Sequence, residues 1–222
     1  MLLVAATLLF GVQLLAGHVI APLAAFGVIT LVLGGVLLRK RPRWLLVLAA
    51  TVAVLYLGGG APFMVANLAH PESPGSFLSE AFLLVAFLTV LAGVALRLWG
   101  SSHTARRGVV IAALAVAATA TAGSLLTAAT VDAEARQAGD VPIASERSVF
   151  PAHVELPAGE AVLWLDNRDA FHHTFVIDGA DVHAVMPANS AVRVPIDLDP
   201  GTYRFWCDVP GHEAMEGVLD VR

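Results

Sequence analysis

The sequence predicts two kinds of structure in one chain, an α-helical membrane region followed by an all-β sandwich. The first 129 residues contain long uncharged apolar runs, and about 20 such residues cross the hydrocarbon core of a bilayer. From Val149 onward apolar and polar residues alternate instead, and Pro-Gly and Asp-Gly turns separate the runs. This alternation is typical of half-buried strands. We therefore expect a membrane region at 1–129, a linker at 130–148 and a β domain at 149–222.

The membrane region is expected to contain about five transmembrane helices. Residues 2–38 carry no charge, a stretch too long for one ordinary span, and Gly17, His18 and Pro22 offer a break. The five apolar segments are about 2–17, 19–38, 44–66, 77–99 and 109–129, and a glycine run with Pro62 loosens the end of the third. Four spans with one long tilted helix is an alternative. A cleaved signal peptide at 2–16 is another, although no basic residues precede it.

Basic residues in the loops predict the orientation. They cluster in two connections, as Arg39, Lys40, Arg41 and Arg43 in one and as Arg97, Arg106 and Arg107 in the other. The intervening loop at 67–79 has Glu72 and no Lys or Arg. Because basic loops stay on the cytoplasmic side, the chain is expected to be a multi-pass protein of the cytoplasmic membrane with everything after Ala129 outside.

The segment after the membrane region is acidic. From Thr130 onward there are six Arg and sixteen Asp or Glu residues, a formal difference of −10. Residues 130–148 are polar or turn-forming and show no apolar period, so they are expected to be a linker. The six or seven short strands that follow imply a β-sandwich. The acidic charge provides solubility or steers a cationic partner, and it argues against nucleic acid.

One loop near the C-terminus gathers soft metal ligands. Cys207, the only cysteine, ends an aromatic strand, His212 follows a Pro-Gly turn, and Met215 comes three residues later. Together with a second imidazole, these residues form the His₂Cys set with a weak axial Met that is typical of blue-copper sites. The alternatives are a buried structural thiol for Cys207 and an ordinary apolar residue at the start of the last strand for Met215.

The second imidazole is His172 or His173. On a strand, His173 shares a face with the apolar residues Phe175 and Ile177, whereas His172 points to the opposite face. This alternation favours His173.

These two segments resemble the cupredoxin family, which includes plastocyanin, azurin and halocyanin. The resemblance covers residues 149–221, about a third of the chain, and rests on Asn167 shortly before a His-Thr pair and on a closing Met-x-Gly-x-Leu-x-Val pattern at 215–221. It implies a Greek-key β-sandwich that holds one type 1 copper through His173, Cys207, His212 and Met215. It also implies that Thr174 ties the two ligand loops together. With His173 as the ligand, His172 on the opposite face of the strand is expected to be an exposed neighbour. The chain departs from the common pattern in placing only two residues between His212 and Met215, where many relatives have three or four.

The function that this resemblance implies is single-electron transfer outside the cytoplasmic membrane by a membrane-anchored blue copper protein that is not an enzyme. Its partner would be a redox protein or a respiratory or photosynthetic complex with a basic docking surface. A binuclear oxidase-type site needs two loop cysteines, and position 211 is glycine. A multicopper enzyme needs many more histidines. A copper-handling protein, for binding, delivery or sensing, stays as the alternative.

Five histidines lie outside these motifs, three of them at the predicted membrane surfaces. His18 and His70 fall near the outer face and His103 near the inner one. Ionisable groups in membrane regions are functional candidates by default, here for haem or copper, but single interfacial histidines are common. His153 and His183, in the β domain, are expected at its surface.

Overall fold

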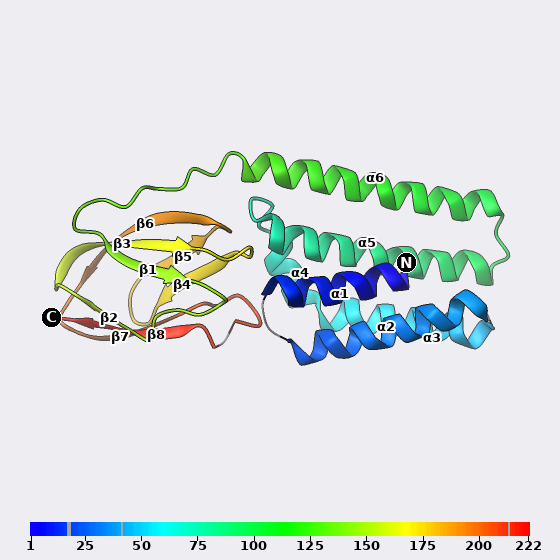
Figure 1. Ribbon diagram of the computed structural model, residues 1–222, viewed down its shortest axis with the longest axis horizontal. Coiled ribbons are helices and arrows are strands. Elements are labelled where there is room, and N and C mark those ends of the chain that lie inside the picture. The colour runs from blue at the N-terminus through cyan, green and yellow to red at the C-terminus, as the bar shows by residue number, and fades with distance from the viewer. Residues whose placement is uncertain (17–18, 41, 213) are drawn as a thin grey trace. The chain divides into compact units, whose positions relative to one another are not determined.

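The computed structural model describes residues 1–16, 19–40, 42–212 and 214–222, and it divides into two compact units. The first unit, residues 1–68 and 78–123, is helical. The second, residues 69–77 and 124–222, contains every strand among the described residues (Figure 1). His18, one of the predicted interfacial histidines, lies outside the described residues.

The helices follow the apolar runs of the sequence. They are α1 (Leu2–Ala16), α2 (Ala21–Arg39), α3 (Arg43–Gly59), α4 (Ala61–Leu68), α5 (Pro74–Leu98) and α6 (His103–Ala128). Within the described part of the chain, α2, α5 and α6 are long and apolar enough to cross a membrane, and the α3–α4 pair makes a fourth span if it is counted as one. Helix α1 has only 15 residues, fewer than the roughly 20 that a span needs. The expected count of five spans is therefore not confirmed.

The third apolar segment is a broken helix. Helices α3 and α4 meet at Gly60 with a bend of 61°. The amide of Gly60 still donates to the carbonyl of Tyr56 at 2.8 Å, but Pro62 has no N–H with which to continue the hydrogen-bond ladder. The glycine run and this proline explain the bend at the position where the sequence predicts a loosened helix end.

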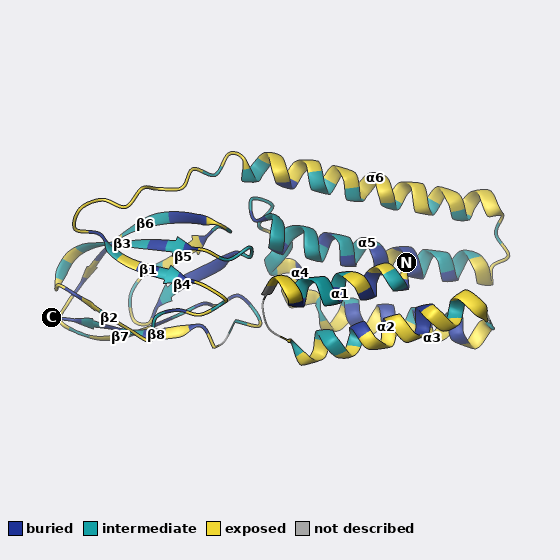
Figure 2. Ribbon diagram, viewed as in Figure 1, coloured by how far each residue is buried: buried dark blue, intermediate teal, exposed yellow. Residues whose placement is uncertain are grey.

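The helical unit is packed around an aromatic cluster and is apolar on its outside. The ring of Tyr56 stacks on Phe87 with centroids 4.5 Å apart and meets the edge of Phe26 at 5.5 Å. Large apolar side chains such as Val65 and Trp99 are more than two-thirds exposed. Figure 2 shows many exposed positions along helices α2, α3 and α6. Such an exterior would be costly in water and is consistent with a membrane region.

The second unit is a two-sheet β-sandwich. Its strands are β1 (Val141–Ser145), β2 (His153–Leu156), β3 (Gly159–Asn167), β4 (His173–Ile177), β5 (Val182–Met186), β6 (Ser190–Leu198), β7 (Gly201–Trp206) and β8 (Glu216–Val221). One sheet has the order β1-β3-β6 and the other β2-β8-β7-β4-β5. Pairs β1–β3 and β2–β8 are parallel, and the others are antiparallel. A core with Phe150, Phe175 and Phe205 at its centre joins the two sheets.

The segment that the sequence presents as a linker contains a strand and packs on the sandwich. Strand β1 lies within 130–148 and buries Ile143 completely. Upstream of it, Trp164 donates its indole N–H to the carbonyl of Glu134 at 2.7 Å, and Arg193 makes a bidentate ion pair with Asp140. Turn-forming residues around β1 hide its short alternation in the sequence, and only its pairing with β3 identifies it as a strand.

Candidate metal centre

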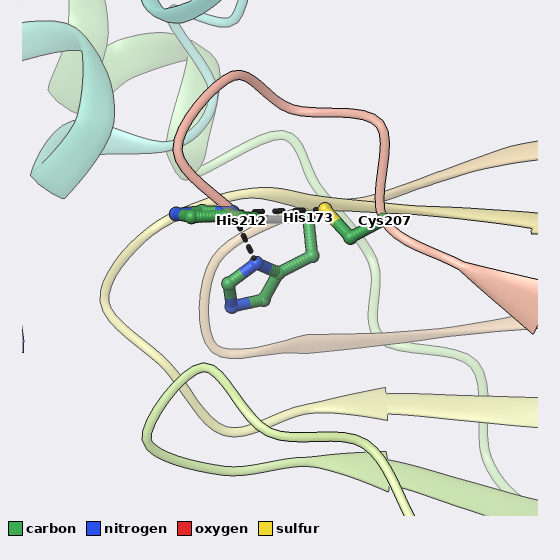
Figure 3. Close-up of side chains that lie close together, drawn as sticks. All are labelled: His173, Cys207 and His212. Carbon is green, nitrogen blue, oxygen red and sulfur yellow. Dashed lines mark hydrogen bonds between the residues drawn. The ribbon is translucent and has the colours of Figure 1, made fainter. Parts of the chain in front are cut away.

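Three of the predicted ligands come together between β4 and the loop after β7. Nδ1 of His173 lies 3.1 Å from Nδ1 of His212, and that nitrogen lies 3.6 Å from Sγ of Cys207. One donor atom from each residue lies within 4.8 Å of the other two, close enough for all three to hold one metal ion. Figure 3 shows the three side chains converging, His173 from the start of β4 and both Cys207 and His212 from the loop after β7. His173 and Cys207 are buried, and His212 is half-buried.

The loop that carries Cys207 and His212 is shaped by its own backbone. Gly211 has a φ of +88°, which L side chains rarely adopt, so the Pro-Gly turn needs its glycine. The amide of His212 donates to the carbonyl of Val209 at 3.0 Å, and the amide of Cys207 donates to that of Met215 at 2.9 Å. These bonds fold the loop back on itself and keep both predicted ligands on one side of it.

Thr174 joins this loop to strand β4, as the resemblance implies. Its hydroxyl donates to Oδ1 of Asp208 at 2.6 Å and accepts from the Asp208 amide at 2.9 Å. Its own amide donates to Sγ of Cys207 at 3.4 Å. One side chain therefore links the two segments that supply ligands, and the same residue gives the sulfur a hydrogen-bond donor.

Asn167 organises the loop before His173. Its side-chain oxygen accepts from Ser145 and from the Asp169 amide, while its nitrogen donates to the carbonyls of Phe171, Met186 and Pro187, all between 2.9 and 3.1 Å. The side chain is almost fully buried, so replacing it would leave several backbone groups without partners. This network explains the value of an asparagine six residues before the predicted ligand.

Asp169 contacts the predicted ligand His173, and the sequence analysis did not identify it as a candidate. Its Oδ2 lies 2.9 Å from Nε2 of His173, and the carboxylate also accepts from the amides of Arg147 and Ser148. A partner on one ring nitrogen fixes the orientation of the other, which here faces Cys207 and His212. In the sequence, the feature that could have indicated this contact is an acidic residue four positions before the predicted ligand His173. Burial would lower the pKa of His173, but Asp169 and Cys207 outweigh it and raise the pKa.

The surroundings of Cys207 favour the thiolate. Burial by itself would raise the pKa of the thiol, but hydrogen bonds with His173, His212 and Thr174 outweigh it and lower the pKa to about 5. The thiolate is the form that binds metals. A thiolate between two imidazoles is the donor set of a type 1 copper centre, so the chemistry of these residues fits that ion.

Met215 is in the core beside the predicted ligand loop. Its side chain is 1% exposed and belongs to the same apolar cluster as Cys207 and Val209. Its amide donates to the carbonyl of His212 at 2.8 Å, which closes the short turn between the two residues. This placement is compatible with an axial thioether, and equally with a packing role.

His172 is not the exposed neighbour that the sequence analysis expected. It is 1% exposed, and Ser76 lies 3.0 Å from its Nδ1. Burial, together with the neighbouring charge of His70, lowers the pKa of His172 to about 3, so its ring is neutral. The expectation failed because strand alternation assumes solvent on the opposite face, whereas residues 69–77 cover that face.

The other histidines that the structure describes do not join this cluster. His70 contacts Glu72 at 2.8 Å, and its ring lies against His172. His103 is exposed at the start of α6. His153 and His183 are more than half exposed, as expected of surface residues. His153, Glu155 and Asp220 also come within ligand distance of one another, but Arg222 already pairs with both carboxylates.

Residues 109–221 match the model of the cupredoxin-like domain family. The match covers just over half of the chain, and the chain belongs to this family. It begins inside α6, upstream of the segment in which the sequence motifs lie. The donor set of His173, Cys207 and His212 is consistent with one type 1 copper ion in this domain. No match was found among curated proteins.

Solved structures that align with part of this chain include amicyanin, rusticyanin and a copper-containing nitrite reductase. Amicyanin from Paracoccus versutus is 20% identical with a TM-score of 0.32, and the alignment covers 43% of this chain and 88% of that one. Rusticyanin from Thiobacillus ferrooxidans is 19% identical with a TM-score of 0.32, covering 37% and 76%. A copper-containing nitrite reductase from Thermus scotoductus is 23% identical with a TM-score of 0.31, covering 42% and 24%.

Proposed function

We propose that this protein is a membrane-anchored type 1 copper protein that transfers single electrons on the extracytoplasmic side of the cytoplasmic membrane. The observation that carries the proposal is the convergence of Nδ1 of His173, Sγ of Cys207 and Nδ1 of His212. Met215 is the proposed fourth, axial ligand. Bound copper would supply one-electron redox chemistry.

The protein's part is to hold the ligands still. Asp169 restrains the ring of His173, and Thr174 restrains the loop that carries Cys207. Ligands that are fixed before and after electron transfer need little rearrangement, which suits a carrier. His212 is the least buried of the three, so we propose that electrons enter and leave on its side.

The orientation proposal has two supports. The first is the pair of basic loops, which favours a cytoplasmic location for those connections. The second is that residues 69–77, from the loop without Lys or Arg, belong to the same compact unit as the β-sandwich. A loop that packs on the sandwich must lie on its side of the membrane. We propose that the membrane part ends near Ala129.

The partner proposal rests on charge. The region after Ala129 has ten more acidic than basic residues, which favours association with a basic docking surface. A redox protein or a respiratory or photosynthetic complex with such a surface would fit. Steering of this kind weakens as ionic strength rises, so electron transfer to such a partner should slow in high salt.

The test of the function is the visible spectrum of the copper-loaded full-length protein, followed by a reductive titration. We expect an intense Cu(II)–thiolate absorption that disappears on uptake of one electron per chain. A colourless protein that binds Cu(II) would contradict the proposal. Reversible loss of copper to a chelator of moderate affinity, with no fast electron exchange, would favour the copper-handling alternative.

The orientation has its own test. A tag placed after Arg222 should be cleaved by protease added to intact cells, while a tag in the loop after Arg39 should be protected. Protection of the C-terminal tag until the membrane is breached would overturn the proposed location, whatever the spectrum shows.

A further inference from the structure

Residues 69–77, which join α4 to the first turn of α5, are part of the same unit as the copper domain. We call them the docked loop. Its two serines, Ser73 and Ser76, are 0% and 1% exposed. Serine is rarely buried so completely unless its hydroxyl has partners. The contacts of these two residues therefore indicate what the loop does.

Ser76 holds His172, the residue bonded directly to the predicted ligand His173. The backbone N–H of His172 donates to the Ser76 hydroxyl oxygen at 2.9 Å, and Nδ1 of the same residue lies 3.0 Å from that oxygen. A hydroxyl can accept the first bond and donate the second. One buried side chain therefore restrains both the backbone and the ring of His172.

Further contacts keep the docked loop in place. The amide of Ala188 donates to the Ser73 hydroxyl at 3.0 Å, and the His70 ring lies 4.3 Å from that of His172. At Gly75 the packing is closer still, because an added Cβ would lie 1.9 Å from the carbonyl oxygen of Ala170. Only glycine allows this approach, so the sequence of the loop is matched to the surface it covers.

We propose that Ser76 is a positioning residue of the copper centre, acting through His172 on the orientation of His173. The proposal rests on the proposed function. Asp169 restrains the ring of His173 from one side, at Nε2. Ser76 restrains the backbone that leads into His173 from the other. The docked loop, about 100 residues before the ligand in the sequence, is thereby a structural part of the centre.

The experiment compares copper-loaded full-length Ser76→Ala with Ser73→Ala. Both changes remove one hydroxyl from a buried position in the same loop, but only the first removes a contact with His172. Copper affinity is measured by chelator competition, and the centre by electron paramagnetic resonance, visible absorption and reduction potential. Loss of partners that orient a ligand typically weakens metal binding about 10- to 100-fold. Ser76 acts one residue further away, so we expect about a 3- to 10-fold loss with a changed spectrum, and a native centre in Ser73→Ala.

Each outcome decides the proposal. Equal changes in both variants would mean that Ser76 only packs the loop, and a native spectrum and affinity in Ser76→Ala would remove its role altogether. If Ser76→Ala does not fold, Gly75→Ala decides, because its Cβ must displace the loop next to Ser76, and an unaltered centre there would overturn the inference. A wild-type protein with no blue band would instead refute the proposed function, which the unsubstituted chain tests separately.

Discussion

The helical and β-sheet units of this protein become compact in different ways. In the helical unit, helices α1 and α2 approach closely where α2 has glycine. A Cβ at Gly34 would come within 2.9 Å of the Leu3 side chain, whereas one at Gly35, facing away, would meet nothing within 4 Å. In the β unit, large side chains from both sheets fill a common core. Glycine therefore allows the close approach of α1 and α2, whereas large apolar side chains separate the two sheets.

This difference explains why chemistry could be located in one unit and not in the other. The helical unit is built from a few apolar residue types that recur, so no position stands out in its sequence. The β unit places one cysteine, a histidine pair and an asparagine at distinctive spacings.

The largest effect is expected at the thiolate. Cys207→Ser should abolish the Cu(II)–thiolate absorption entirely, since Cys207 is the only cysteine of the chain. The sandwich should still fold, because serine is of similar size. Visible absorption of the copper-loaded variant, with circular dichroism as a check on folding, makes the measurement. A blue band that survived the change would remove the blue-copper hypothesis.

Next comes the helix contact in the other unit. Gly34→Leu should lower the free energy of unfolding in detergent by roughly 1–3 kcal/mol, the usual cost of overpacking. Gly35→Leu is the matched control, because both substitutions gain the same helix propensity and only the first meets α1. Thermal or SDS unfolding measures the difference. Equal stability of the two variants would show that close approach of α1 and α2 does not hold the helical unit together.

The axial position should give an intermediate effect. Met215→Gln replaces a soft thioether with a harder oxygen donor, which favours Cu(II), so the reduction potential should fall. A tenfold change in relative affinity for the two copper states corresponds to about 59 mV for one electron, and we expect at least that.

Met186 provides the control for the axial substitution. It is fully buried in β5 and pairs with His173 across the sheet. Met186→Gln therefore buries a comparable amide near the same ligand. Protein-film voltammetry measures both potentials. If the reduction potential shifted in Met186→Gln but not in Met215→Gln, the assignment of Met215 as the axial ligand would be wrong.

The smallest effect concerns residues 130–148, the segment that the sequence presents as a linker. Hydrogen bonds from Arg193 and from the Gln137 amide lower the pKa of Asp140 from 3.8 to about 2. A carboxylate whose folded pKa is lowered stabilises the protein above the unfolded value and loses that contribution as the pH falls through the folded one. Asp140→Asn should therefore be less stable than the wild type at pH 7, and this difference should vanish as the pH approaches 2.

Thermal unfolding in detergent, followed by tryptophan fluorescence at several pH values, measures that difference. A gap between Asp140→Asn and the wild type that stayed constant from pH 7 to pH 2 would show that the ion pair with Arg193 is not its source. It would also favour the loose linker that the sequence suggests over the packed segment seen in the structure.

Several features could be predicted from the sequence because local chemistry determines them. The change from uncharged apolar runs to alternation separates helices from strands at about Ala129, since each periodicity belongs to one backbone geometry. The spacing of Cys207, His212 and Met215 predicts a metal loop because few other residues offer soft donors. Asn167 is part of the same signature, and the structure supplies its physical reason in five hydrogen bonds.

Other features depend on contacts between distant segments and could be identified only from the three-dimensional structure. Ser76 lies 96 residues before His172, and no periodicity links the two, so the burial of His172 could not be predicted from strand alternation. Strand β1 exists because β3 supplies its hydrogen-bond partners. The loop geometry that brings Asp169 onto His173 likewise depends on amides from Arg147 and Ser148. The sequence determines which polar groups are available. The free energy of burying each one depends on the hydrogen-bond partners that folding brings to it.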